Sequence, residues 1–159
     1  MNEIKCNIAG VEFKELKKHS DQRGWLSEIF RQDEIDNGKF PVMSYISMTK
    51  PGVTRGPHEH KDQTDYICFV GQSSFKIYLW DNRPDSPTTG KFFEFVAVEG
   101  GPVSVKIPPG VVHAYKNIGL AEGIIINSPD KLYAGHGKNE PVDEIRYENQ
   151  PDSRFKLDD

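Results

Sequence analysis

This sequence is poor in cysteine, has no long apolar run and shows no candidate signal segment. Its two cysteines, Cys6 and Cys68, are far apart and lack CxxC spacing, so neither a disulfide framework nor a zinc knuckle is indicated. No stretch approaches the roughly 20 consecutive apolar residues that cross a bilayer, and the first ten residues lack the apolar core of a secretory signal. We therefore expect a cytoplasmic protein that does not bind a membrane.

Positive charge is also scarce. The chain has 20 Lys and Arg against 24 Asp and Glu, a net charge of −4, and its basic residues form no block. Such a surface is unsuited to neutralising a nucleic-acid backbone, so we expect no nucleic-acid partner. The 159 residues match the usual size of one domain, and neither repeats nor low-complexity tracts divide them. We predict a single domain over residues 1–159.

What the chain does have is a series of short β-rich runs separated by Gly, Pro, Asn and Asp. These runs cover residues 42–48, 65–71, 73–80, 91–98, 103–108 and 123–127. Their rhythm predicts an all-β sandwich or barrel. Apolar and polar side chains alternate over 74–79, which predicts one buried face and places Tyr78 on the opposite, outer face.

The two ends of the chain have less regular patterns. We expect residues 1–40 to hold N-terminal strands and one short helix over 31–38, which Asn37 and Gly38 end. Residues 141–159 are charged and punctuated by proline. We expect them to form a peripheral C-terminal arm whose end frays.

Two separated histidine motifs carry the strongest functional signal. His58-x-His60 is followed by Asp65, and much later a Pro-Pro-Gly turn at 108–110 precedes His113. This spacing resembles the two signature motifs of the cupin superfamily. Residues two apart on a strand share a face, so His58 and His60 can both point into a barrel and meet His113 there. Three imidazoles and a carboxylate suit a divalent transition metal such as iron, manganese, nickel or zinc, which is one hypothesis for the site.

A second set of residues resembles another family. The stretches are Asp21-x-Arg23-Gly24 with Glu28, Arg55-Gly56-x-His58, DNRPDSPTTGK (81–91) and IPPGVVHAY (107–115). In this order they resemble the stretches that mark dTDP-4-dehydrorhamnose 3,5-epimerases. The resemblance covers about residues 20 to 150 and implies a double-stranded β-helix, the cupin jelly roll. It also implies a homodimer, and a long N-terminal segment would otherwise leave a sheet edge unpaired.

The resemblance implies a role for each matching residue. His58 would be the base that removes the proton beside the keto group of a nucleotide-linked sugar. Arg23, Glu28 and Arg55 would surround the diphosphate and nucleotide, and His113 would line the sugar pocket. No cofactor is implied, because an imidazole and a donor to the developing enolate suffice for this chemistry.

Three positions depart from the epimerase pattern. The lysine that follows the base is Asp65 here, and the tyrosine expected as the opposing acid falls at Asn127. The carboxylate that should orient the base falls near Gln150, with Asp152 as a substitute. An anion in place of a cationic donor would destabilise an enolate, so the pocket differs in chemistry from that of a standard double epimerase.

The same positions are similar to dTDP-sugar 3,4-ketoisomerases. That family carries a His-x-His-Lys element, as in residues 58–61, and a tyrosine on the preceding strand, as Tyr45 is here. It also has a small polar residue followed by a tyrosine, as in NSPDKLY (127–133). Together the resemblances imply catalytic roles for His58, His60 and Tyr133. They imply substrate-binding roles for Arg23, Glu28, Tyr45, Arg55, Asp65, His113 and Asn127.

Three functions therefore stay open. The first is a metal-free epimerase or isomerase that moves protons on a nucleotide-linked 4-keto-6-deoxy sugar in deoxysugar or cell-surface polysaccharide biosynthesis. The second is a metal-dependent cupin enzyme that uses His58, His60, Asp65 and His113 as ligands. The third is a protein that binds a sugar nucleotide but has lost catalysis along with the lysine and tyrosine.

Overall fold

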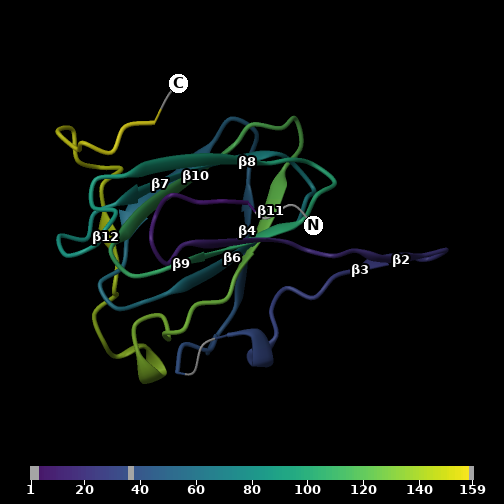
Figure 1. The fold of residues 1–159 in the computed structure, drawn as a ribbon, viewed down its shortest axis with the longest axis horizontal. Helices are drawn as coiled ribbons and strands as arrows, with labels where there is room; N and C mark the ends of the chain where they lie inside the picture. The colour runs from purple at the N-terminus through teal and green to yellow at the C-terminus, as the bar shows by residue number, and fades with distance from the viewer. Residues whose placement is uncertain (1–3, 36–37, 158–159) are drawn as a thin grey trace.

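The computed structural model describes residues 4–35 and 38–157, and nearly all of its regular structure is β (Figure 1). The strands are β1 (Glu12–Glu15), β2 (His19–Asp21), β3 (Gly24–Leu26), β4 (Tyr45–Thr49), β5 (Thr54–Glu59), β6 (Asp65–Phe69), β7 (Phe75–Asp81), β8 (Phe92–Ala97), β9 (Val103–Ile107), β10 (Val111–Asn117), β11 (Gly123–Asn127) and β12 (Ile145–Arg146). Two 3₁₀ turns, η1 (Gln32–Glu34) and η2 (His136–Lys138), complete the described elements. Each of the six predicted runs overlaps one strand.

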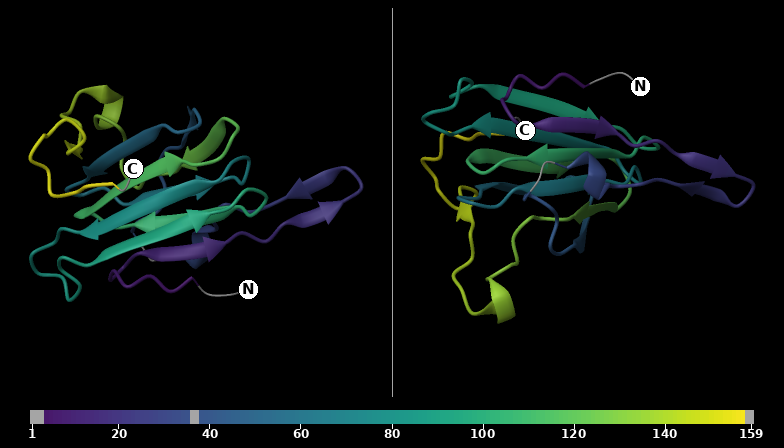
Figure 2. Two further views of the ribbon diagram at one scale, coloured as in Figure 1. Left: turned by 90° about the horizontal axis from the view of Figure 1, so that it is seen from above. Right: turned by 60° about the horizontal axis from the view of Figure 1, so that its bottom comes forward.

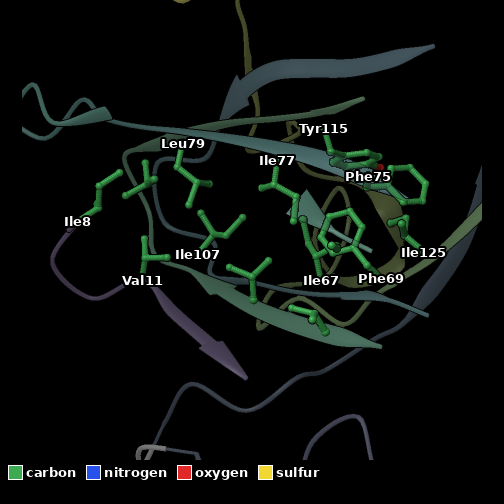
Figure 3. Close-up of a cluster of buried hydrophobic side chains, with 14 residues drawn as sticks. Ile8, Val11, Ile67, Phe69, Phe75, Ile77, Leu79, Ile107, Tyr115 and Ile125 are labelled. Atoms are coloured by element: carbon green, nitrogen blue, oxygen red, sulfur yellow. The ribbon is translucent and has the colours of Figure 1, made fainter. Parts of the chain in front are cut away.

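Two five-stranded antiparallel sheets form the body of the molecule. One has the strand order β1-β9-β6-β11-β4 and the other has the order β12-β5-β10-β7-β8. Apolar side chains from both sheets meet between them, among them Phe69 from β6 and Ile77 from β7 (Figure 3). Burial of these side chains is the main source of stability for such a fold. The all-β jelly roll predicted from the sequence is confirmed.

One prediction about the faces of β7 is wrong. Phe75, Ile77 and Leu79 belong to the core as expected, but Tyr78 on the opposite face is also buried, at 2% exposure. Its ring stacks with that of Trp80, and their centroids are 6.2 Å apart. Both faces of this strand are therefore covered, which a simple alternation of apolar and polar residues does not indicate.

The helix predicted over 31–38 is also wrong in its described part. Only a single 3₁₀ turn, η1, is present, and Ile35 directly after it already has an extended backbone. Residues 36–37 lie outside the described residues. The segment is rich in charge and buries no side chain of the turn, so no apolar face stabilises a longer helix.

The C-terminal arm is attached to the second sheet. β12 pairs with β5, placing Arg146 opposite His58, and the chain then runs along the end of the body (Figure 2). Phe155 is buried against the rings of Trp80 and Tyr147, at centroid distances of 5.7 and 4.6 Å. The arm predicted as peripheral thus covers part of the outer face of β7 and contributes a strand beside the histidine motif.

The loop after β7 contains the 81–91 motif and is built around Asp81. This buried carboxylate accepts hydrogen bonds from Arg83, Ser86 and Thr88 at 2.6–2.9 Å. Arg83 also donates to the carbonyl oxygen of Ala9 at 2.7 Å. This motif therefore ties the loop to the N-terminal segment.

The β2–β3 hairpin extends away from the two sheets, as Figures 1 and 2 both show. Its described contacts are mainly internal, and Trp25 and Leu26 are exposed. At the edge of the first sheet, β4 likewise exposes Ile46 and Met48. Within the described residues, no helix is both long and apolar enough to span a membrane.

Candidate active site

The two histidine motifs meet at one point between the sheets. His58 on β5 lies opposite His113 on β10, and His60 follows directly after β5. The ring centroids of His58 and His113 are 4.3 Å apart. Asp65 reaches the same point from β6 in the other sheet. One potential ligand atom from each of these four residues lies within 4.8 Å of the others.

Asp65 is the most buried member of this cluster, at 1% exposure. Its Oδ2 atom lies 3.2 Å from the Nε2 atoms of both His60 and His113. Its Oδ1 atom accepts hydrogen bonds from the amides of Gln63 and Asn127, each at 2.9 Å. Burial alone would raise the pKa of Asp65, but the neighbouring histidines hold this pKa well below its usual range.

His58 is held in a neutral form beside a carboxylate. Burial, followed by the neighbouring imidazoles, lowers the pKa of His58 to about 2. Its Nε2 atom lies 3.9 Å from Oε1 of Glu144, which precedes β12. The close approach of β5 to β10 needs Gly56, which has φ +83°, because a Cβ there would lie 2.5 Å from the carbonyl oxygen of His113.

His60 is oriented by Asp143 in the C-terminal segment. The Nδ1 of His60 donates to the carbonyl oxygen of Asp143, and the Asp143 carboxylate accepts the backbone N–H groups of residues 61–63 at 2.7–3.0 Å. Burial opposes protonation of His60, but the adjacent Asp65 carboxylate outweighs it and raises the pKa of His60 to about 9. Asp143 therefore fixes both the ring and the loop that follows it.

Asp143 and Glu144 have roles that the motifs did not indicate. The sequence placed the orienting carboxylate near Gln150 or at Asp152, but both of these residues are exposed and neither lines the cavity beside His58. Among the described residues, Glu144 is the carboxylate that pairs with His58, at 3.9 Å from its Nε2 atom. The only sequence signal for these two residues is that they form an acidic pair directly before Ile145 and Arg146. Such a pair is common on solvent-exposed surfaces, so it does not indicate a role in the site.

A cavity of about 1250 Å³ opens onto His58 and His60. Tyr45, Arg55 and Tyr133 also line it, together with much of the segment 129–148. Cationic side chains of this segment gather in the lining, namely Lys131, Lys138 and Arg146. Acidic side chains such as Asp130, Glu140 and Glu148 lie in the same lining, which therefore carries both signs of charge. A cavity of this size can hold an elongated ligand, with one end at the histidines.

Tyr45 and Asn127 connect the cavity to the buried carboxylate. The amide of Asn127 donates to Oη of Tyr45 and to Oδ1 of Asp65, both at 2.9 Å. Burial raises the pKa of Tyr45 to about 12, so its hydroxyl keeps a proton. By accessible surface Tyr45 is 46% exposed, and Tyr133, which lies in the segment that forms the rim, is 58% exposed.

The predicted nucleotide-binding residues divide into two groups. Arg55 lines the cavity and donates to Thr49 and to the carbonyl oxygen of Met48, at 2.9 and 2.8 Å. Arg23 forms an ion pair with Asp21 in the turn of the β2–β3 hairpin, and Glu28 pairs with Arg31. Neither Arg23 nor Glu28 is part of the described cavity lining of this chain.

Comparison with known proteins yields close matches. The family described as dTDP-4-dehydrorhamnose 3,5-epimerase matches residues 5–134. The probable low-salt glycan biosynthesis epimerase Agl13 of Haloferax volcanii is 42% identical over 129 residues, which are 80% of this chain and 81% of that protein. The spore coat polysaccharide biosynthesis protein SpsL of Bacillus subtilis is 38% identical over 112 residues, 70% of this chain and 73% of that protein.

Solved structures share the fold. A mutant of ChmJ, a 3′-monoepimerase from Streptomyces bikiniensis in complex with dTDP, superposes with a TM-score of 0.77. It is 23% identical, and the superposition covers 89% of this chain and 71% of that one. The family match over most of the sequence, joined to the Haloferax relative, shows that this chain belongs to the dTDP-4-dehydrorhamnose 3,5-epimerase family.

Proposed function

We propose that this protein is a sugar-nucleotide epimerase that acts by proton transfer next to the keto group of a nucleotide-linked 4-keto-6-deoxy sugar. The observation that carries this proposal is a neutral, partly buried His58 at the wall of a large cavity, with the Glu144 carboxylate beside it. Relatives named for glycan and spore coat polysaccharide biosynthesis support a role in making a deoxysugar or a cell-surface polysaccharide.

The proposed reaction needs one base and one acid. A neutral imidazole such as that of His58 can remove the proton from the carbon beside the carbonyl, whose electrons then form the enolate. Return of a proton to the other face of that carbon inverts it and restores the ketone. No atom is gained or lost, and Glu144 would stabilise the imidazolium that forms on His58 between the two steps.

Tyr45 is better placed than Tyr133 to supply the second proton. The Tyr45 oxygen accepts the Asn127 N–H, which leaves its own hydroxyl proton free to point elsewhere. The side chain lines the cavity, and its raised pKa keeps it protonated. We therefore propose Tyr45 as the acid, in place of the family tyrosine whose position Asn127 occupies. Tyr133 would contact substrate at the rim.

We also propose that the protein acts as a homodimer. Arg23 is 85% exposed at the end of a hairpin that leaves its own body, so it cannot easily reach the cavity of the same chain. A second copy could receive this hairpin at the exposed apolar edge of β4, which includes Ile46 and Met48. In that assembly, each cavity would take its diphosphate contacts from Arg55 of one chain and Arg23 of the other.

Two measurements test the dimer. Light scattering at micromolar concentration should give twice the chain mass, and Ile46→Lys should lower it where Val98→Lys, at an exposed site beyond β8, does not. Mixing the inactive variants Arg23→Ala and His58→Asn, with exchange of subunits, should restore activity, because some heterodimers hold one complete site. A monomeric wild-type protein would refute this arrangement.

We further propose that the enzyme works in the cytoplasm. Cys6 and Cys68 are both free, which suits a reducing compartment. Fractionation of cells that produce the tagged full-length protein should recover it with the cytoplasmic marker. Recovery with the membrane or the external fraction would contradict this location.

The proposed activity can be tested directly by NMR. The protein is incubated with dTDP-linked and UDP-linked 4-keto-6-deoxyhexoses, and the sugar ring protons are followed for a new stereoisomer. We expect one of these substrates to be converted, with inversion at a carbon next to the keto group. Tight binding of a nucleotide sugar without any conversion would instead favour a protein that binds the ligand but does not catalyse.

A further inference from the structure

Two buried polar atoms at the centre of the histidine cluster have no hydrogen-bond partner among the described residues. They are Oδ2 of Asp65 and Nε2 of His113. The two atoms are 3.2 Å apart, close enough to attract each other electrostatically, but they are not aligned as a hydrogen bond. Leaving such groups unsatisfied destabilises the fold, and more strongly for a charged group than for a neutral one, so the pair calls for an explanation.

The hydrogen bonds of the two imidazoles fix where their lone pairs point. Nδ1 of His60 faces the carbonyl oxygen of Asp143, and Nδ1 of His113 faces that of Val111 at 3.1 Å. A carbonyl oxygen can only accept, so both Nδ1 atoms carry hydrogen, and when a cation displaces any proton from Nε2 the lone pair of each ring is on Nε2. The amide nitrogen of Gln63, 3.3 Å from Nε2 of His60, is a donor and agrees with this tautomer.

Three electron-pair donors therefore converge on one point. Nε2 of His60 and Nε2 of His113 each lie 3.2 Å from Oδ2 of Asp65. Ligands that sit 2.0–2.2 Å from one small cation are separated from each other by about 3.0–3.5 Å in tetrahedral or octahedral geometry. The hydrogen bonds around these three side chains are also those of a metal site. Metal-binding histidines commonly donate their other ring N–H to a backbone carbonyl, and the carboxylates that bind metal accept hydrogen bonds from neighbouring groups.

We infer that His60, Asp65 and His113 bind a divalent transition metal ion through Nε2, Oδ2 and Nε2. Two imidazoles and a carboxylate suit zinc, iron, manganese or nickel, and three protein ligands leave a position open for water or substrate. His58, the fourth member of the cluster, has its Nε2 near Glu144 at 3.9 Å. We assign His58 to proton transfer and not to the metal.

The catalytic role that we give to the metal rests on the proposed epimerase function, whereas the test of metal binding does not. Asp65 stands where the family pattern has a lysine, and an anion there would oppose the formation of an enolate. A bound cation reverses the local charge and can polarise the keto oxygen, which is the task of the missing lysine. The cluster reaches the cavity through His60, which is part of its lining.

Metal binding is measured on the full chain, first by elemental analysis after purification without added metal. Chelator-treated protein is then titrated with Co²⁺, and the visible absorption of the bound ion is recorded. We expect about one ion per chain and saturation at one equivalent. Asp65→Asn and His113→Gln should each weaken Co²⁺ binding by at least about 10- to 100-fold. His19→Gln, on the remote β2–β3 hairpin, should bind as wild type does.

The outcomes separate this inference from the proposed function. Unfolding curves of each variant show whether a loss of binding merely reflects a loss of fold, and His60→Gln provides a second ligand variant at a less buried position. No stoichiometric ion in wild type, or Co²⁺ binding that survives all three ligand substitutions, overturns the metal site. Conversion of substrate by a protein shown to be metal-free would leave the epimerase proposal intact and reject only the inference.

Discussion

His113 on β10 and His58 on β5 are direct cross-strand partners, with ring centroids 4.3 Å apart at a crossed angle of 67°. This pairing comes from one sheet, while Asp65 comes from the other. The site therefore exists only when both sheets are packed together. Binding of ligand to it should accordingly stabilise the whole fold, because the unfolded chain does not bring these groups together.

Glu144 should act as the positioning residue for His58. Replacing Glu144 with Gln removes the charge beside the imidazole, and we expect kcat to fall by about 10- to 100-fold with a smaller change in KM. Steady-state kinetics measure both. Glu148→Gln is the matched control: both residues line the cavity and pair with Arg146, at 2.8 Å for Glu144 and 3.7 Å for Glu148, but of the two only Glu144 also pairs with His58 in the described structure. Equal losses in the two variants would point to a general charge effect and not to orientation of the base.

Tyr45 and Tyr133 should differ in the step that they affect. Tyr45→Phe removes the proposed acid, so we expect proton removal to continue while formation of the inverted product falls by about 10²- to 10⁴-fold. Tyr133→Phe, at the exposed rim, should mainly raise KM. NMR of the substrate in heavy water separates exchange from inversion. The assignment is wrong if Tyr133→Phe, and not Tyr45→Phe, blocks inversion.

The histidine site was largely predictable from the sequence, because its spacing is set by strand geometry. His58 and His60 lie close in the sequence, and the turn before His113 marks the start of β10. The supports of the site were not predictable in the same way. Asp143 and Glu144 are more than 80 residues from the histidines that they contact, and only the pairing of β12 with β5 brings them there.

Asp81 should make stability depend on pH in the acid range. Burial alone would raise its pKa, but hydrogen bonds from Arg83, Ser86 and Thr88 hold the pKa of Asp81 well below its usual range. A lowered folded-state pKa gives stability that is present above the unfolded pKa of about 3.9 and is lost as pH falls through the folded value. We expect Asp81→Asn to lower the free energy of unfolding by about 2–3 kcal/mol at pH 7.

The test is denaturant unfolding of both proteins from pH 7 down to pH 2. The difference between wild type and Asp81→Asn should shrink as the pH drops below about 4, since protonated Asp81 loses the same charge. Asp85→Asn serves as the control, because Asp85 is an exposed residue of the same loop. A difference that stays constant over this range would contradict the role of the ionised carboxylate.

Phe155 should hold the C-terminal arm against the second sheet. Truncation to Ala removes its packing on Trp80 and Tyr147, and we expect a loss of about 3–5 kcal/mol in the free energy of unfolding. Activity at temperatures where the variant stays folded should also fall, because the arm carries Glu144. Lys156→Ala, which removes an exposed neighbour, should change neither quantity. Unchanged unfolding in Phe155→Ala would show that the arm adds little to the fold.

The family resemblance predicted the fold and the family of this chain better than it predicted which residues line the cavity. The 81–91 motif is characteristic of the family, but its Asp81 network serves to join the loop to the N-terminal segment. Arg23 and Glu28 match the same pattern, yet they lie on and beyond a hairpin that leaves the body. A sequence motif identifies residues that match the family pattern. How far those residues lie from the active site depends on how the chain packs and on whether two chains assemble.

The central claim is that His58 removes a proton from the sugar, and solvent exchange tests it most directly. Wild-type protein incubated in heavy water with a dTDP-linked 4-keto-6-deoxyhexose should place deuterium at a carbon next to the keto group, because the enolate takes its new proton from exchangeable sources. His58→Asn should lower this exchange by about 10²- to 10⁴-fold while binding of dTDP, measured by calorimetry, stays near the wild-type value. Exchange that continues unchanged in His58→Asn would contradict the account.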